Sequence, residues 1–204
     1  MAPSTSAPKD INSVIAGMVD RGAWKYWDTL TTTAGTALMT SYQFYSVPIG
    51  MVDPITGLQK TKLQTNMQRG NQFPPPRCLV LMRLGFEFKN MLKADIDNFL
   101  ANYYYELRID DKIFFEGLLE YAPPGVGDFG SSTNSGESAW GTGFPAWQCA
   151  IPWGEYSKYI APLQQFSLTL TCPNTPPTLT ASDVGGQGLL LVPFMDGLTD
   201  RSVQ

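Results

Sequence analysis

The stretch Tyr103–Tyr121 has the sequence YYYELRIDDKIFFEGLLEY, in which alternating apolar positions lie on either side of a central Asp-Asp pair. A period of two is typical of a half-buried strand, because successive side chains of a pleated chain point to opposite faces. Two such strands joined at the acidic pair form an antiparallel hairpin whose apolar side chains share one face, and that face fixes the register. The predicted partners on this face are Leu107 with Phe115, Ile109 with Ile113, and Tyr103 with Leu119.

The opposite face of this hairpin is polar. The same register places Glu106 opposite Glu116, and it places Arg108 on that face too. Two carboxylates directly opposite each other repel, so this pairing is tolerable only where water reaches both of them. The apolar face must then pack against a second sheet. We therefore predict an all-β fold, an antiparallel β-sandwich with this hairpin at its middle.

Composition supports one β-rich domain. The chain has 204 residues with 19 Gly and 16 Pro, and only 16% are charged, which suits many short strands and turns. The net charge of −4 gives no basic face for phosphate, so we expect no direct binding of nucleic acid. No apolar run is long enough to span a membrane. The first ten residues, MAPSTSAPKD, lack the pattern of a signal peptide, which favours synthesis in the cytosol.

The cysteines fit that interpretation. Cys78, Cys149 and Cys172 are odd in number and lack CxxC spacing, so they indicate neither a disulfide framework nor a thiolate zinc site. We expect them to be free thiols packed in strands.

Residues 1–23 are predicted to form an N-terminal arm with a short helix, and residues 24–204 the sandwich domain. Asp10 is a good N-cap, and Gly22 is placed to end the helix. The helix could lie on a neighbouring subunit or cover its own sandwich. Its apolar residues, at helical spacing, are Ile11, Val14, Ile15 and Met18.

About eight strands are expected along the rest of the chain, as in a single jelly roll; an immunoglobulin-like sandwich is the alternative. In 78–88 the predicted inward residues are Cys78, Val80, Met82, Leu84, Phe86 and Phe88, and in 165–172 they are Phe166, Leu168, Leu170 and Cys172. The other predicted strands lie within 25–33, 36–47 and 146–152, and in 189–194 with a resumption after Gly197. Asp95 is expected to cap a helical turn that bears Ile96, Phe99, Leu100 and Tyr103.

Two long connections interrupt this pattern. Residues 48–76 are rich in turn residues and show little periodicity, and 123–143 are rich in Gly, Ser and Asn. Connections of this length inside a compact domain are usually functional or contact something else.

The sequence excludes much of catalysis. It contains no histidine, which removes Ser-His-Asp and Cys-His catalysis and every histidine general base. The GxGxxG at 125–130 follows a proline pair and opens no helix, so it does not indicate a nucleotide site. A two-carboxylate glycosidase using Glu106, Glu116 or Glu120 remains an option, but a wet strand face explains these residues at least as well. We expect no enzyme activity, cofactor or metal.

Aromatic residues are dense between residues 140 and 159. They are Trp140, Phe144, Trp147, Trp153, Tyr156 and Tyr159. Aromatics in loop-like sequence must be buried or form a contact. These aromatic residues can cover the hydrophobic core of the sandwich, form a subunit interface, or stack on sugar rings.

The order of features from Lys60 onward resembles the jelly-roll coat proteins of tailless icosahedral phages. The residues that carry the resemblance are KTKLQTNM (60–67), FPPPRCLVLMRLGFEF (73–88), a short helix, YYYELRIDDKIFFEGLLEYAPPG (103–125), a Gly/Ser/Asn loop, QFSLTLTCP (165–173) and a last strand ending at RSVQ (201–204). The likeness covers about two thirds of the chain and rests on the order of strands and not on a unique motif.

The resemblance implies a virion subunit with no catalytic residues, present in many copies in a shell beside other virion proteins. It leaves open a contact with an internal viral membrane. Unlike many small coat proteins, this chain has only Lys9 as a basic residue before Arg21. The competing interpretation is a carbohydrate-binding module or lectin that uses the aromatics of 140–159.

For a coat subunit, we expect segments 48–76 and 123–159 to make most contacts between subunits. Large apolar side chains supply most of the energy at such interfaces. The candidate interface residues are Met51, Met67, Phe73, Phe129, Trp140, Phe144, Trp147 and Trp153.

Overall fold

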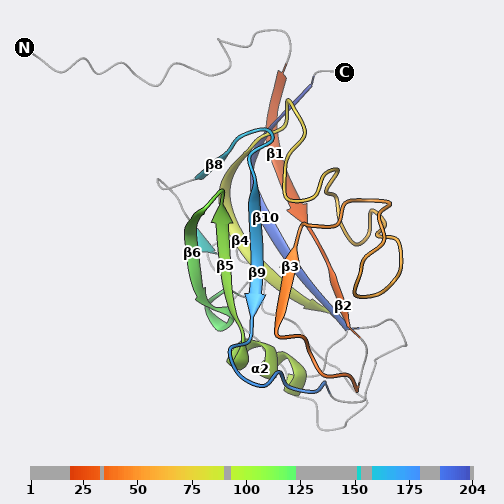
Figure 1. Ribbon diagram of the computed structural model, residues 1–204. Coiled ribbons are helices and arrows are strands. Elements are labelled where there is room, and N and C mark those ends of the chain that lie inside the picture. The colour runs from red at the N-terminus through yellow and green to blue at the C-terminus, as the bar shows by residue number, and fades with distance from the viewer. Residues whose placement is uncertain are drawn as a thin grey trace, which may run out of the picture.

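A computed structural model of the chain describes residues 19–32, 35–89, 93–122, 151–152, 158–179 and 189–202. Within these residues the fold is mainly β, and two antiparallel sheets lie face to face with the hydrophobic core between them (Figure 1). This confirms the predicted all-β sandwich in its coarse architecture.

The first sheet runs in the order β1-β10-β4-β7, with β2 also paired to β10 and β8 to β4. Its strands are β1 (Val19–Trp27), β2 (Leu30–Thr32), β4 (Leu79–Lys89), β7 (Ile151–Pro152), β8 (Lys158–Ile160) and β10 (Leu189–Ser202). The second sheet runs β3-β9-β5-β6, formed by β3 (Ser41–Phe44), β5 (Tyr104–Ile109), β6 (Lys112–Leu118) and β9 (Phe166–Thr171). Helix α2 (Lys93–Asn102) and the short 3-10 helix η1 (Leu119–Tyr121) lie at the two ends of the β5–β6 hairpin sequence.

The β5–β6 hairpin is present, and its register is confirmed except next to the turn. Leu107 pairs with Phe115 and Glu106 with Glu116 as predicted, and the Leu119 N–H donates to the Tyr103 carbonyl over 3.0 Å. Leu107 is fully buried, and Arg108 is exposed and forms an ion pair with Glu106.

The predicted pairing of Ile109 with Ile113 is wrong. Ile109 pairs with Lys112 across a two-residue turn in which Asp110 has a φ of 53°, and Arg108 pairs with Ile113. Phe114 is left over as the extra residue of a β-bulge, and this inverts the faces beyond it. Ile109 is therefore buried, whereas Ile113 is 47% exposed.

A second bulge corrects the predicted face of β4. Leu81 pairs with Gly197 and Arg83 with Asp196, so Met82 has no partner on β10. The inward residues before the bulge are consequently Leu79 and Leu81, and after it Leu84, Phe86 and Phe88. Val80 is only partly buried and Met82 is 39% exposed, so the inward placement of these two was wrong.

Gly197 allows the two backbones to approach at this bulge. A Cβ added there would lie 2.0 Å from the Val80 carbonyl oxygen. We expect Gly197→Ala to lower the free energy of unfolding by about 1–3 kcal/mol, because the obstructing atom is backbone and cannot rotate away. Urea unfolding followed by circular dichroism measures this. Gly22→Ala in β1 is the matched control, since a Cβ there meets nothing within 4 Å, and equal losses for both variants would contradict the steric explanation.

The beginning of the described chain differs from the sequence prediction. Gly22 lies inside β1 and pairs with Thr199, so it does not end a helix. Strand β1 starts at Val19, inside the segment assigned to the arm, and Arg21 forms two hydrogen bonds of 2.6 and 2.9 Å with Asp200 of β10. The part of the predicted helix that precedes Val19 lies outside the described residues.

The remaining elements follow the sequence closely. In β9 and just after it, Phe166, Leu168, Leu170 and Cys172 are all buried, as predicted. Helix α2 buries Ile96 and Phe99, although Asp95 lies in its first turn and not ahead of it. Strand β10 is continuous through Gly197, where an interruption was expected.

Candidate functional site: an apolar groove beside the 48–76 segment

Residues 48–76, here called the excursion, are fastened to both sheets. They lie on the right of Figure 1, between β3 and β4 in the chain. Asn66 continues the edge of β1: its Oδ1 accepts from the Trp27 N–H over 3.0 Å, and its Nδ2 donates to the Lys25 carbonyl over 2.8 Å. Asn71 in turn donates to the Tyr45 carbonyl and accepts from the Phe166 N–H.

A buried ion cluster holds the excursion at its centre. The Lys60 ammonium donates to Asp28 Oδ1 over 2.7 Å and to the Thr29 carbonyl over 3.1 Å, and it lies 4.0 Å from Asp53. The second Asp28 oxygen accepts from the Tyr45 N–H over 2.7 Å. Burial raises the pKa of Asp28, while the Lys60 ammonium opposes that rise. Asp28 is fully buried and Lys60 and Asp53 are nearly so, and the cluster therefore fixes the excursion against the chain that follows β1.

The three predicted interface residues in the excursion are separated by the fold. Met67 and Phe73 are each 1% exposed and belong to the core, so their side chains cannot contact another subunit while this one stays folded. Met51 is 58% exposed. The sequence showed no period for 48–76, and so gave no means of telling inward from outward residues.

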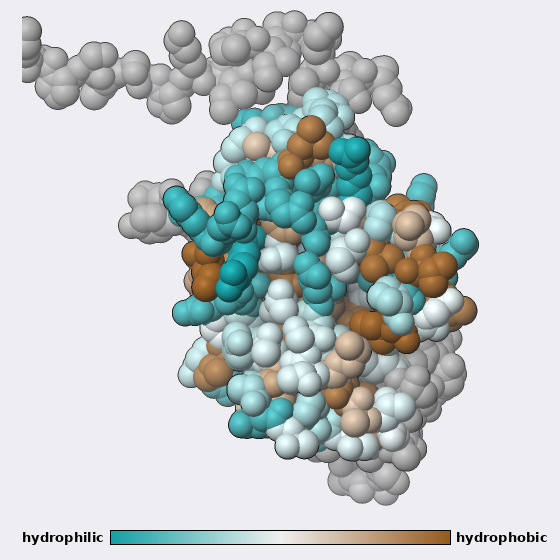
Figure 2. All heavy atoms as spheres, in the orientation of Figure 1, coloured by the Kyte–Doolittle hydropathy of each residue, from teal (hydrophilic) through white to brown (hydrophobic). Residues whose placement is uncertain are grey.

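Several large apolar residues of the excursion are exposed together with Met51. They are Val52 (55% exposed), Ile55 (44%), Leu58 (66%) and Leu63 (91%). Figure 2 shows hydrophobic atoms gathered on the side of the molecule where the excursion lies. These four residues were not predicted from the sequence. The signal that could have identified them is the occurrence of single apolar side chains among polar ones in a segment without periodicity.

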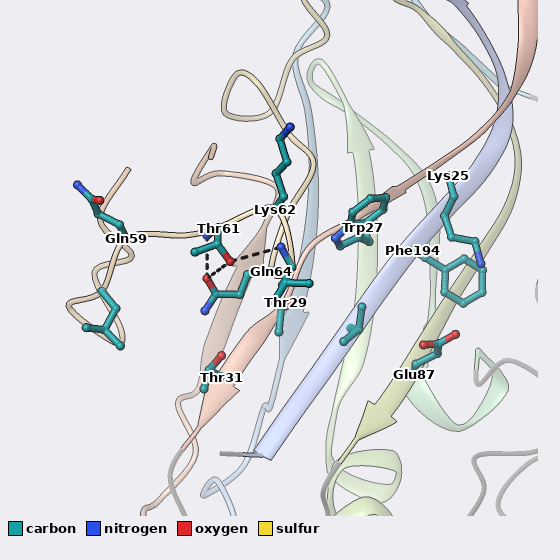
Figure 3. A pocket seen from close by; sticks show the side chains of 13 residues that line it. Lys25, Trp27, Thr29, Thr31, Gln59, Thr61, Lys62, Gln64, Glu87 and Phe194 are labelled. Atoms are coloured by element: carbon teal, nitrogen blue, oxygen red, sulfur yellow. Dashed lines mark hydrogen bonds between the residues drawn. The ribbon is translucent and has the colours of Figure 1, made fainter. Parts of the chain in front are cut away.

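Two of these exposed residues, Leu58 and Leu63, border a groove of about 930 Å³ on the outer face of the first sheet (Figure 3). The groove, here called the sheet groove, lies between the excursion and strands β1, β2, β4 and β10. It is lined by Lys25, Trp27, Thr29, Thr31, Leu58, Gln59, Thr61, Lys62, Leu63, Gln64, Glu87, Val192 and Phe194. Its size is in the range of binding pockets, which is about 300–1,000 Å³.

The floor of the sheet groove contains Phe194 from β10. A Cβ on Gly85 would lie 2.5 Å from the Phe194 Cζ, so the ring lies directly over that glycine of β4. The Lys25 ammonium lies 4.3 Å from the centre of the ring, in cation–π geometry, and 3.9 Å from Asp196. In Figure 3, Trp27 lies between this floor and the excursion.

Some of the polar groups around the groove are already occupied. Gln64 Oε1 accepts from the Thr61 N–H over 2.8 Å, and the Thr61 hydroxyl accepts from the Leu63 N–H over 3.3 Å. Lys25 is occupied by Phe194 and Asp196. The surface left for an occupant is therefore mainly apolar, and its chemistry suits burial of hydrocarbon better than recognition of a polar ligand.

The other residues singled out in the sequence do not join the groove. Glu106 is paired with Arg108, and Glu116 and Glu120 are exposed, which agrees with a wet strand face. Cys78 and Cys172 are buried free thiols, and Cys149 lies outside the described residues. Of the aromatics between 140 and 159, Tyr159 is 55% exposed on β8. The remaining candidates, Phe129, Trp140, Phe144, Trp147 and Trp153, lie outside the described residues, as does the GxGxxG at 125–130.

Comparisons with family models, with curated proteins and with solved structures find no match for this chain. Among the described residues, no helix has the length and apolar character needed to cross a membrane. The fold and the groove therefore carry the functional argument.

Proposed function

We propose that this chain is a structural virion protein, a self-assembling capsid subunit with a single jelly-roll fold, of the kind found in tailless icosahedral phages. The observation that carries the proposal is the nested strand pairing. Strand β1 pairs with β10, β3 with β9, β4 with β7 and β8, and β5 with β6. This order is the one obtained when a long antiparallel hairpin, with β5 and β6 at its closed end, is rolled up into two sheets. Such a rolled-up hairpin is a jelly roll, the double-sheet fold of viral capsid and lectin domains.

The exposed apolar residues of the excursion favour the capsid alternative over a monomeric lectin. Isolated apolar residues on a surface are ordinary, but five large ones on one anchored segment form a patch of the kind that mediates protein contacts. The buried Lys60–Asp28 pair keeps the segment ordered, so less conformational entropy is lost when it docks. A subunit in a shell needs several such contacts, each with an apolar centre and a polar rim.

The proposal includes the setting in which the protein acts. The chain is made in the host cytoplasm and acts in the virion, in many copies and beside other virion proteins, without binding nucleic acid directly. Its role is structural, with no cofactor, metal or catalysis.

Assembly of the purified protein tests this function. We expect the wild type to sediment well above its monomer mass of 22.5 kDa at high concentration, and negative-stain microscopy to show regular particles or arrays. Met51→Asp/Val52→Asp should shift sedimentation toward the monomer, because it places charge in the apolar patch. Gln68→Asp, an exposed position of the same excursion, is the control and should assemble like the wild type.

The lectin alternative predicts a different outcome. A carbohydrate-binding module using the aromatics of 140–159 stays monomeric at every concentration and is retained on a glycan column. Under that alternative, Trp140→Ala abolishes retention and leaves sedimentation unchanged. A monomeric wild type would overturn the capsid proposal, whether or not a glycan is bound.

A further inference from the structure

We propose that the sheet groove of one copy binds residues 11–18 of a neighbouring copy; this rests on the proposed self-assembly. The groove is open, mainly apolar and bordered by Leu58 and Leu63, which are 66% and 91% exposed. Side chains this large and this exposed, on a segment fixed by buried hydrogen bonds and an ion pair, indicate a surface that another element covers.

The chemistry of residues 11–18 matches this surface. Their sequence, INSVIAGM, contains no charge. Its apolar residues follow the i, i+3, i+4, i+7 spacing of one helical face: Ile11, Val14, Ile15 and Met18. Insertion of such a face into an apolar groove is a common mode of protein recognition.

The position of β1 argues that the segment comes from another copy. Val19 begins β1, whereas the groove is lined by Lys25 and Trp27 toward the other end of that strand. At about 3.3 Å per residue, the distances from Val19 to these two residues are roughly 20 and 26 Å. A helix over 11–18 is only about 12 Å long, so it cannot fold back from Val19 and fill the groove of its own chain. An extended segment could reach the groove, but it could not place all four apolar side chains there.

A binding experiment separates the groove from the assembly. In the full-length variant Val14→Asp/Ile15→Asp, the apolar face of residues 11–18 is disrupted and the sheet groove is left unoccupied. A synthetic peptide of residues 8–20 is titrated into this variant by isothermal calorimetry. We expect saturable binding, weakened about tenfold or more when Leu58→Asp/Leu63→Asp is added, because the new charges lie unpaired against apolar side chains. A control peptide with Asn12→Asp/Ser13→Asp carries two added negative charges on its polar side, as many as Val14→Asp/Ile15→Asp adds to the apolar side. This control peptide should bind like the unmodified peptide. Failure of the unmodified peptide to bind overturns the proposal.

A mixing experiment shows whose segment is bound. Val14→Asp/Ile15→Asp and Leu58→Asp/Leu63→Asp should each remain folded and lose assembly when sedimented alone. Mixed in equal amounts they should form paired complexes, because one supplies an intact groove and the other an intact segment. If both variants assemble like the wild type, the exchange is wrong while the capsid function stands. If the wild type itself stays monomeric, the capsid function fails. If the mixture of the two variants also stays monomeric, the exchange of residues 11–18 between copies is overturned as well, even where the peptide binds.

Discussion

Lys60→Met lowers the free energy of unfolding by about 3–5 kcal/mol, because it leaves the Asp28 carboxylate buried without its charge partner. The carboxylate then retains only backbone donors such as the Tyr45 N–H, at a site with no solvent contact. Urea unfolding at neutral pH measures the loss. Lys62→Met is the matched control, since Lys62 is exposed on the same segment, and it should change stability by no more than about 0.5 kcal/mol.

The double variant Asp28→Asn/Lys60→Met should recover part of that loss. The amide oxygen still accepts from the Tyr45 N–H, and the uncompensated buried charge is gone. A loss below about 1 kcal/mol for Lys60→Met alone would show that the ion pair does not hold the excursion in place.

The Lys60→Met defect also depends on pH in a direction that the site fixes. Burial already raises the folded-state pKa of Asp28 above its unfolded value, and removal of the Lys60 charge raises this pKa further. At a pH between the unfolded-state and folded-state pKa values, Asp28 of the folded variant therefore keeps a proton that Asp28 of the unfolded chain has released. Its destabilisation is complete above the folded pKa and diminishes as the pH falls through that value toward the unfolded pKa. Wild type and variant should thus approach each other in stability as the pH is lowered from neutral toward the range in which a free aspartate titrates.

Phe73→Ala is expected to destabilise the subunit itself by about 3–5 kcal/mol, the usual loss for a large aromatic removed from a core. The Phe73 ring lies 4.5 Å from that of Tyr26 on β1 and 4.9 Å from that of Phe166 on β9, measured between ring centres. The excursion thus places this side chain between the two sheets, and its removal leaves a cavity that touches both.

Measurement at low protein concentration separates this effect from assembly. Met51→Ala is the control from the same excursion: it should leave the unfolding midpoint nearly unchanged, because its side chain is exposed. A Phe73→Ala subunit with wild-type stability and lost assembly would return Phe73 to the interface and contradict its place in the core.

The sheet groove depends on the same anchoring. Leu58 and Leu63 flank Lys60 in the chain, and the backbone at Lys60 is hydrogen-bonded to Gly50 and Met51. Loss of the ion pair therefore loosens the wall of the groove as well as the subunit. We expect peptide binding and stability to fall together in Lys60→Met, but to separate in Leu58→Asp/Leu63→Asp, where only the exposed wall changes.

Local alternation in the sequence determined much of the sandwich. Phe166, Leu168 and Leu170 were identified as inward residues, and so were Leu107 and Ile109, because one buried face imposes a period of two. The hairpin at Asp110-Asp111 and the helix before β5 followed from equally local signals. The absence of histidine, and with it the exclusion of histidine-based catalysis, also needs the sequence alone.

The tertiary structure decided what lies beyond a local pattern. Phe114 in β6 and Met82 in β4 are each the one residue of a β-bulge that has no partner, and each exchanges the inward and outward faces of its strand. Only the pairing with the neighbouring strand shows at which residue the bulge lies. The burial of Phe73 was hidden for a similar reason, since its neighbours come from β1 and β9. The sheet groove joins residues near 27, 60 and 194, and no window of sequence contains all three. Alternation specifies which side chains share a face, but the contacts that bring distant segments together exist only once the strands are paired.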